Sequence, residues 1–286
     1  MILDYVHCDV FSPSPYSGNS LAVFPDRGDL TASQMLAITQ ELRHFESIFL
    51  RQDGDQISAR VFDLFEELPF AGHPIIGAAA MLHRRSGAGE TKVWSFNLIN
   101  GRTVDVAASV ERGVCRGRLD QGRPDFLATV ANDQRQYFAE AFNLKPDQLT
   151  RLPLEVISTG LKYLVIPVKD GLAEARIVRP DLEEKLAAIG AEFAYLFDVG
   201  GLEGRHWNND GVMEDVATGS AAGVVGAFAL KHGLAKDGAV FRLKQGRFLG
   251  RPSEIEVTAY GAPDNVSRVE VAGAVAFVGE GKVAAP

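Results

Sequence analysis

The residues best suited to chemistry lie beside two glycine-containing motifs. His73 stands between Gly72 and Pro74 in FAGHPIIGAAAML, residues 70–82, an otherwise apolar segment. Proline is tolerated in the first turn of a helix and glycine permits close backbone approach, so the motif predicts a helix start. A titratable ring at such a start is suited to proton transfer or to anion binding.

A second motif, ATGSAAGVVGAFAL, repeats this arrangement. It places Gly219 and Ser220 before another run of small and aliphatic residues, with Ser220 expected at the N-cap. A helix start presents backbone N–H groups and a partial positive charge, so each motif is a candidate site for a small carboxylated molecule. Our hypothesis is that the two helix starts face one another and hold one such molecule.

Both motifs belong to a longer internal repeat. Gly72 and Gly219 are 147 residues apart, FNLINGR matches FRLKQGR at an offset of 145, and GNSLAVFP parallels GLKYLVIP at an offset of 142. Three matches in the same order predict two copies of one unit of about 140 residues.

The two copies differ where chemistry is expected. Titratable groups appear in only one copy at three equivalent positions, which favours proton transfer over a purely structural duplication. At an offset of 147 the equivalent pairs are Glu46 with Phe193, His73 with Ser220, and Leu68 with Asp215.

Each candidate also has a structural explanation. Glu46 would then be a surface or salt-bridged carboxylate, and His73 would only cap its helix. Asp215 would be an acidic first-turn residue favoured by the helix dipole, and Ser220 only an N-cap.

The remaining pattern predicts a strand-rich α+β fold. Alternating or apolar runs such as ISARVFDLF and KYLVIPV indicate strands, while TASQMLAITQELRHF and PDLEEKLAAIG indicate amphipathic helices, the first with a capping box at Thr31 and Gln34. The segments after Gly72 and Gly219 are apolar nearly all round, so each must be buried, with a curved sheet or barrel wrapped around it. We expect two pseudo-equivalent units, residues 1–125 and 126–286, whose last strand can cross back.

Composition excludes several classes of protein. The 286 residues carry a net charge of -8 without long charged runs, which argues against nucleic-acid binding. The N-terminus has no basic region and no run is long enough to span a membrane, so a cytoplasmic protein is expected. Cys8 and Cys115 have neither disulfide nor metal spacing. Five further histidines show no metal spacing and are expected to be structural or exposed: His7, His44, His83, His206 and His232.

Five segments together resemble the PhzF-like phenazine biosynthesis isomerase family along nearly the whole chain. They are GNSLAVFPD, RHFESIFL, ELPFAGHPIIGAAA, EDVATGSAAG and QGRFLGRPSEIEV. The resemblance implies the diaminopimelate epimerase-like fold, no cofactor or metal, and a homodimer. It also implies that Glu46 is the proton-shuttling acid/base, with His73 and Asp215 beside it, and that Gly72, Gly219 and Ser220 bind the substrate.

Departures from the family pattern concern the substrate-facing loop. Val216 stands where the family usually has proline, and RHWNNDG replaces a segment with phenylalanine and proline. Amino-acid epimerases of the same fold use two cysteines at positions that match Ala71 and Thr218 here, so a two-thiol mechanism is excluded.

We therefore expect an isomerase that moves a proton between carbons of a small anionic metabolite, which can be a dihydro-hydroxyaromatic acid. Two alternatives remain open: a non-catalytic metabolite-binding or interaction protein, and a same-fold epimerase of a small carboxylic acid that uses one carboxylate and one imidazole.

Overall fold

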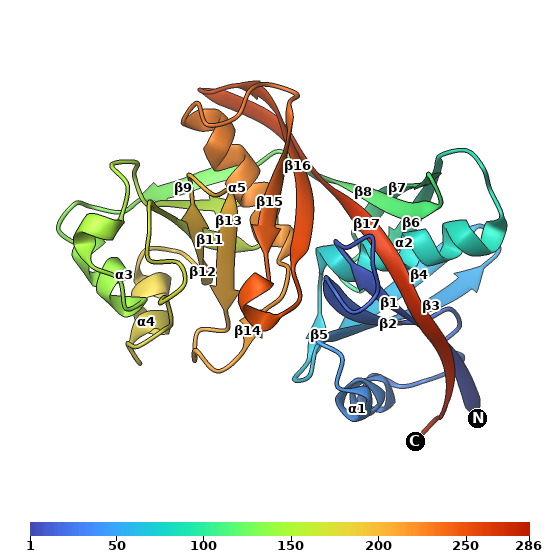
Figure 1. Cartoon of the computed structure of the whole chain (residues 1–286). Coiled ribbons are helices and arrows are strands. Elements are labelled where there is room, and N and C mark those ends of the chain that lie inside the picture. Colours follow the sequence, from blue (N-terminus) through green and yellow to red (C-terminus); the bar gives the residue numbers. More distant parts are fainter. The chain divides into compact units, whose positions relative to one another are not determined.

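The computed structural model describes all 286 residues and divides the chain into two compact units (Figure 1). Unit 1 contains residues 1–120 and 272–286, and unit 2 contains residues 121–271. Strand β17 (Asn265–Ala284) has 20 residues, of which the first part belongs to unit 2 and the last part to unit 1. In unit 1 it pairs antiparallel with β1 (Ile2–Val10), which brings the two ends of the chain together.

Unit 1 is a curved, mostly antiparallel sheet with two parallel pairings, β2 with β3 and β4 with β6, and the first of these lies at the candidate residue Glu46. Strand β2 pairs antiparallel with β1 and parallel with β3, and this parallel register places Leu21 opposite Glu46. Strand β4 pairs with β3, β5 and β6, and β7 joins β6 to β8. The other elements of unit 1 are β2 (Asn19–Phe24), α1 (Ala32–Leu42), β3 (Glu46–Asp53), β4 (Gln56–Phe62), β5 (Glu67–Leu68), α2 (Gly72–Ser86), β6 (Lys92–Asn97), β7 (Thr103–Glu111) and β8 (Val114–Gly122).

Unit 2 repeats this plan. Strand β11 pairs parallel with β12, with Tyr163 opposite Phe193, the residue equivalent to Glu46. Strand β13 pairs with β12, β14 and β15, and β15 pairs with β16. The elements of unit 2 are β9 (Asp125–Thr129), α3 (Arg135–Ala141), β10 (Glu155–Ser158), β11 (Lys162–Val168), α4 (Leu182–Ala188), β12 (Phe193–Asp198), β13 (Glu203–Trp207), β14 (Glu214–Asp215), α5 (Gly219–Lys231), β15 (Val240–Gln245) and β16 (Ser253–Ala262), with 3-10 turns at Pro146–Gln148 and Arg247–Leu249.

Each unit encloses one small-residue helix, as the sequence predicted. Eleven of the 15 residues of α2 and eleven of the 13 residues of α5 are buried. Glycine is required for close packing: a Cβ on Gly77 would lie 2.4 Å from Leu21 Cδ2, and one on Gly226 would lie 2.5 Å from Val257 Cγ1. The strands therefore approach these helices more closely than any larger residue would permit, and the predicted α+β fold class is confirmed.

The outer faces of the sheets are covered by the remaining helices. In unit 1, α1 begins at the predicted capping box, where Thr31 is the N-cap, and packs Met35 and Ile38 against Phe24, Phe49 and Phe62. Phe24 and Phe49 stack with ring centroids 4.4 Å apart.

In unit 2, α4 follows the predicted pattern and buries Leu182 and Leu186. The pattern did not predict α3, which has only seven residues and no side-chain cap, although it buries Phe138 in the same core. Among the helices, none has both the length and the apolar character needed to cross a membrane.

Candidate active site

In unit 1 the structure brings Glu46 and His73 together. Glu46 is the first residue of β3 and His73 is the second residue of α2, and the distance from His73 Nδ1 to Glu46 Oε2 is 3.6 Å. Their side chains are only 10% and 5% exposed. Glu46 is therefore not the exposed carboxylate of the structural alternative, and its partner is the predicted imidazole.

The N-cap residue of α2 has no side chain that could cap the helix. The N-cap is Ala71, which has extended backbone and no capping hydrogen bond, so His73 does not cap the helix. Gly72 and His73 form the first turn with Pro74, whose missing N–H costs nothing there. The partial positive charge of this helix start lies beside the Glu46–His73 pair.

Asn19 and a salt bridge support the same region from neighbouring strands. Asn19 Nδ2 lies 3.5 Å from His73 Nδ1, so the amide contacts the ring that faces Glu46. Arg60 in β4 donates from Nε to Glu67 Oε1 at 2.7 Å and from its Nη2 atom to Oε2. This bidentate pair fastens the short strand β5, which precedes α2, to β4. The strand that leads into Gly72 is thereby fixed by a charge-assisted contact.

In unit 2, Asp215 is held by a network of hydrogen bonds. Thr218 Oγ1 donates to Asp215 Oδ2 at 2.7 Å and the Ala217 N–H donates to Oδ1 at 3.3 Å. Gln245 Nε2 donates to the Asp215 carbonyl at 2.8 Å, while its Oε1 accepts from the Thr218 N–H and from Tyr195 Oη.

One expectation for the second motif, Ser220 at the N-cap, and one structural alternative, Asp215 in the first turn, were wrong. The N-cap of α5 is Thr218, so Ser220 is the second helical residue, and its Oγ lies 2.8 Å from Tyr163 Oη. The Thr218 hydroxyl does not cap the helix because Asp215 accepts its proton. Asp215 itself lies in β14, three residues before the N-cap, and not in the first turn of the helix.

His206 was expected to be either structural or exposed, and the structure shows that it is buried. It pairs across strands with Asp215, and its Nδ1 lies 3.0 Å from the Ala194 carbonyl, so Nδ1 carries the proton. Its ring is edge-on to Tyr163 and Phe193, with centroids 5.5 Å apart in both cases. Burial lowers the pKa of His206, and the nearby Asp215 charge only partly offsets this, so the ring is neutral.

The long-range contacts around the candidate residues were not identified from the sequence, although one of these contacts, an arginine–glutamate pair, occurs in both units. Arg205 donates to both oxygens of Glu214, at 2.8 and 2.7 Å, and so fastens β14 to β13 as Arg60 and Glu67 fasten β5 to β4. The offsets of 145 and 147 between these pairs equal those of the repeat, which was the available signal. Tyr163 and Gln245 gave no comparable local signal. No group of three or more His, Cys, Asp or Glu residues is arranged to hold a metal ion.

These features define a protein with the diaminopimelate epimerase-like fold and a buried carboxylate–imidazole pair at the start of a buried helix. A solved structure described as a probable proline racemase from Agrobacterium radiobacter is 15% identical with a TM-score of 0.60, covering 99% of this chain and 93% of that one, and it shares the fold alone.

Within that class, the model of the family "Phenazine biosynthesis-like protein" matches residues 8–281, and the chain belongs to this family. A trans-2,3-dihydro-3-hydroxyanthranilate isomerase from Pseudomonas aeruginosa is 32% identical over 295 residues, 97% of this chain and 98% of that protein. An uncharacterized isomerase, YddE, from Escherichia coli O157:H7 is 31% identical over 95% of both chains. A solved structure from Pseudomonas aeruginosa, described as a predicted epimerase, is 44% identical with a TM-score of 0.92, covering 99% of this chain and 100% of that chain. Together these place the protein among the isomerases.

Proposed function

We propose that this protein moves a proton between two carbons of a small carboxylated metabolite without a cofactor. The observation that carries the proposal is the buried pair in unit 1, where His73 Nδ1 is 3.6 Å from Glu46 Oε2 at the uncapped start of α2. A carboxylate in such a setting can remove a proton from carbon, hold it, and return it to another carbon.

The roles follow from the chemistry of each group. Glu46 takes the proton and becomes a neutral acid, while the electron pair left on carbon is delocalised through the substrate toward its carboxylate. His73 orients Glu46 by contact with its carboxylate. Glu46 then gives the proton to a second carbon, so atoms and charge balance without water or any added reactant.

Substrate binding is assigned to the helix starts. Gly72 in unit 1 and Gly219 in unit 2 offer backbone N–H groups with the partial positive charge of their helices, which suits a carboxylate. Ser220 adds a hydroxyl that Tyr163 orients at 2.8 Å. Asp215, held by Thr218, serves the same reaction as a second polar group of fixed geometry.

The substrate class is supported by the relatives. Proteins about one third identical over nearly their whole length act, by their names, on trans-2,3-dihydro-3-hydroxyanthranilate, a carboxylated dihydro-hydroxyaromatic compound. We propose a substrate of this class for the present chain. A same-fold epimerase remains the second candidate, because the 44% identical structure is described as a predicted epimerase. The N-cap residues Ala71 and Thr218 carry no thiol for a two-cysteine mechanism.

Proton NMR in deuterated water separates the candidates. Incubation with trans-2,3-dihydro-3-hydroxyanthranilate should give a product with a shifted double bond and, because Glu46 exchanges with solvent, some deuterium at the new carbon position. Inversion at one carbon with the double bonds unchanged would identify an epimerase. Saturable binding with neither change would identify a binding protein and refute the proposal.

We also infer a homodimer, supported by the family resemblance, and a cytoplasmic location for it. Light scattering coupled to size-exclusion chromatography should give twice the chain mass of 30.9 kDa. A mass of one chain at micromolar concentration would contradict this part of the proposal.

A further inference from the structure

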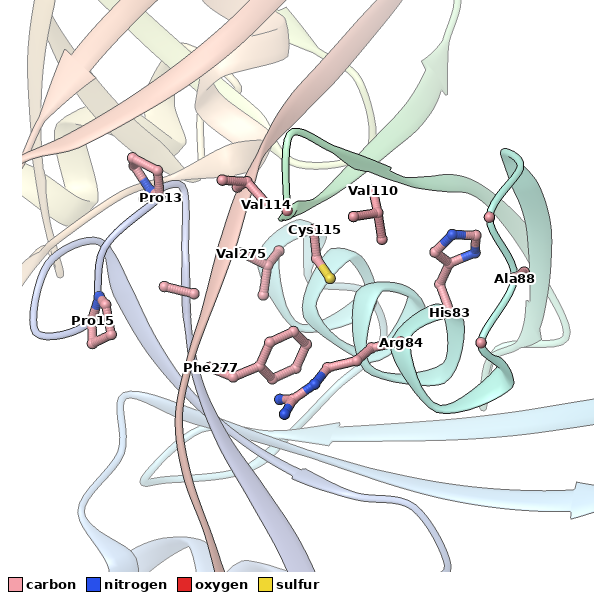
Figure 2. A pocket seen from close by; sticks show the side chains of 14 residues that line it. Pro13, Pro15, His83, Arg84, Ala88, Val110, Val114, Cys115, Val275 and Phe277 are labelled. Carbon is pink, nitrogen blue, oxygen red and sulfur yellow. The ribbon is translucent and has the colours of Figure 1, made fainter.

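Unit 1 contains a cavity at the opposite end of α2 from the Glu46–His73 pair. Its volume is about 650 Å³, within the usual range for small-molecule sites. His83 and Arg84, on the last turn of α2, contribute to its lining together with Val110, Cys115 and Phe277 (Figure 2). Ten residues separate His73 from His83, which corresponds to about 15 Å along a helix, so the cavity is distinct from the proposed active site.

His83 gives this cavity an unsatisfied polar group. Its side chain is fully buried, and neither ring nitrogen has a hydrogen-bond partner within the protein. A neutral imidazole has one donor and one acceptor, and leaving both unpaired in a buried position is costly and rare in native proteins. His83 lines the cavity with its ring nitrogens covered by neighbouring atoms, so a ligand with polar atoms satisfies them once the ring turns toward the cavity.

Arg84 supplies a positive charge at the same place. No carboxylate lies within ion-pair distance of its guanidinium, which stacks on Phe277 with 4.4 Å between its central carbon and the ring centroid. Burial raises the pKa of the adjacent Cys115 thiol, and the Arg84 charge partly offsets this, so the positive field reaches the cavity wall. An arginine without an acidic partner on an aromatic face is well placed to bind an anion.

The apolar side chains of the lining and the charges at the end of α2 indicate which kind of anion the cavity can bind. The other side chains of the lining are apolar, with Val110 from β7 and Val275 and Phe277 from β17, so a fully hydrated inorganic ion would leave these surfaces unused. The helix C-terminus carries about half a negative charge, which disfavours an anion. The full charge of Arg84 outweighs it, and Arg85 adds a second positive charge nearby.

We propose that this cavity binds a small organic monoanion with an apolar body, such as an aryl carboxylate. The carboxylate pairs with Arg84 and accepts or shares a hydrogen bond with His83, while the apolar body packs on Phe277 and Val110. This site is independent of the proposed isomerase reaction, since none of its residues belongs to that machinery.

Titration calorimetry with benzoate, benzamide and inorganic phosphate tests the proposal. The Glu46→Gln variant is used throughout, so that turnover does not contribute to the heat. Benzoate should bind saturably, and neutral benzamide at least about tenfold more weakly, because the charge-assisted contact is lost. Phosphate should not compete at equal concentration. Absence of saturable benzoate binding, or equal binding of all three probes, would overturn the proposal.

Matched variants locate the binding. Arg84→Gln and Arg85→Gln remove the same charge from neighbouring exposed positions, but only Arg84 lines the cavity. Arg84→Gln should weaken benzoate about tenfold and Arg85→Gln less than about twofold. Equal effects of the two changes would place benzoate elsewhere and refute the site.

The reactivity of Cys115 tests independently whether benzoate binds in this cavity. Cys115 lines the cavity whereas Cys8 is completely buried in the core of the unit. Saturating benzoate should slow modification of Cys115 by a thiol reagent at least about threefold, while Cys8 stays unmodified with or without ligand. Unchanged labelling of Cys115 at saturation would contradict binding in this cavity. His83→Leu should also weaken benzoate, with an unchanged melting temperature as the control for folding.

Discussion

Removing Arg205 should destabilise unit 2 more than any surface substitution. Its side chain and that of Glu214 are each 9% exposed, and the pair is bidentate. The guanidinium also donates to the carbonyls of Leu172 and Ala175, at 2.7 and 3.0 Å. It lies between the rings of Trp207 and Phe248, 4.4 Å from each centroid.

The expected cost follows from what Arg205→Met leaves behind. Breaking a buried pair strands a carboxylate and typically costs about 3–5 kcal/mol, a third or more of the stability of many domains. Arg205→Lys keeps the charge but loses the bidentate geometry and should cost less than the methionine variant. The double variant Arg205→Met with Glu214→Leu should recover part of the loss, because no charge is left buried.

Urea denaturation followed by circular dichroism measures these free energies of unfolding. Hydrogen exchange by mass spectrometry assigns the loss to residues 121–271. Arg242→Gln is the matched control, since Arg242 is 65% exposed and 3.7 Å from Glu254, and it should cost less than about 1 kcal/mol. The reasoning fails if Arg205→Met costs no more than Arg242→Gln, or if the double variant is less stable than the single one.

Three further outcomes are expected. Because burial holds the pKa of His206 below its unfolded value of about 6.5, the unfolded chain binds more protons at acid pH, and stability should fall as the pH drops below about 6.5. In His206→Gln the slope of unfolding free energy against pH should decrease by up to about 1.4 kcal/mol per pH unit, whereas parallel curves would argue against a buried neutral ring. Thr218→Val should destabilise by about 1–3 kcal/mol and lower turnover at least about tenfold, since Asp215 loses its 2.7 Å donor; unchanged kcat would remove Asp215 from the reaction. Gly226→Leu should prevent close packing against Val257 and yield insoluble or molten protein, and a wild-type melting temperature would contradict the packing argument.

The central helices could be predicted because their signals are local. The apolar runs after Gly72 and Gly219 have no polar face, and the capping box at Thr31 involves residues three apart. The internal repeat then predicted two similar units, and the equivalent parallel registers at Leu21–Glu46 and Tyr163–Phe193 follow it.

The candidate site could be predicted only in part, because its contacts are long-range. The proximity of Glu46 and His73, 27 residues apart, depends on a parallel strand and a helix start that meet only in the folded unit. The ATGS motif offers two hydroxyls near the helix start, and the sequence alone did not show that Asp215 takes the one at Thr218. Gln245 and Tyr163 contact this motif from strands 27 and 57 residues away, so no local pattern identified them.

Turnover of Glu46→Gln compared with Glu41→Gln tests the central claim most directly. Both variants remove one carboxylate, but Glu46 is buried beside His73 whereas Glu41 is exposed on α1. With trans-2,3-dihydro-3-hydroxyanthranilate as the substrate, Glu46→Gln should lower kcat by at least about 10²-fold at an unchanged melting temperature, and Glu41→Gln should retain wild-type kcat. Wild-type turnover by Glu46→Gln would contradict the account, because no other group in unit 1 has been assigned to carry the proton.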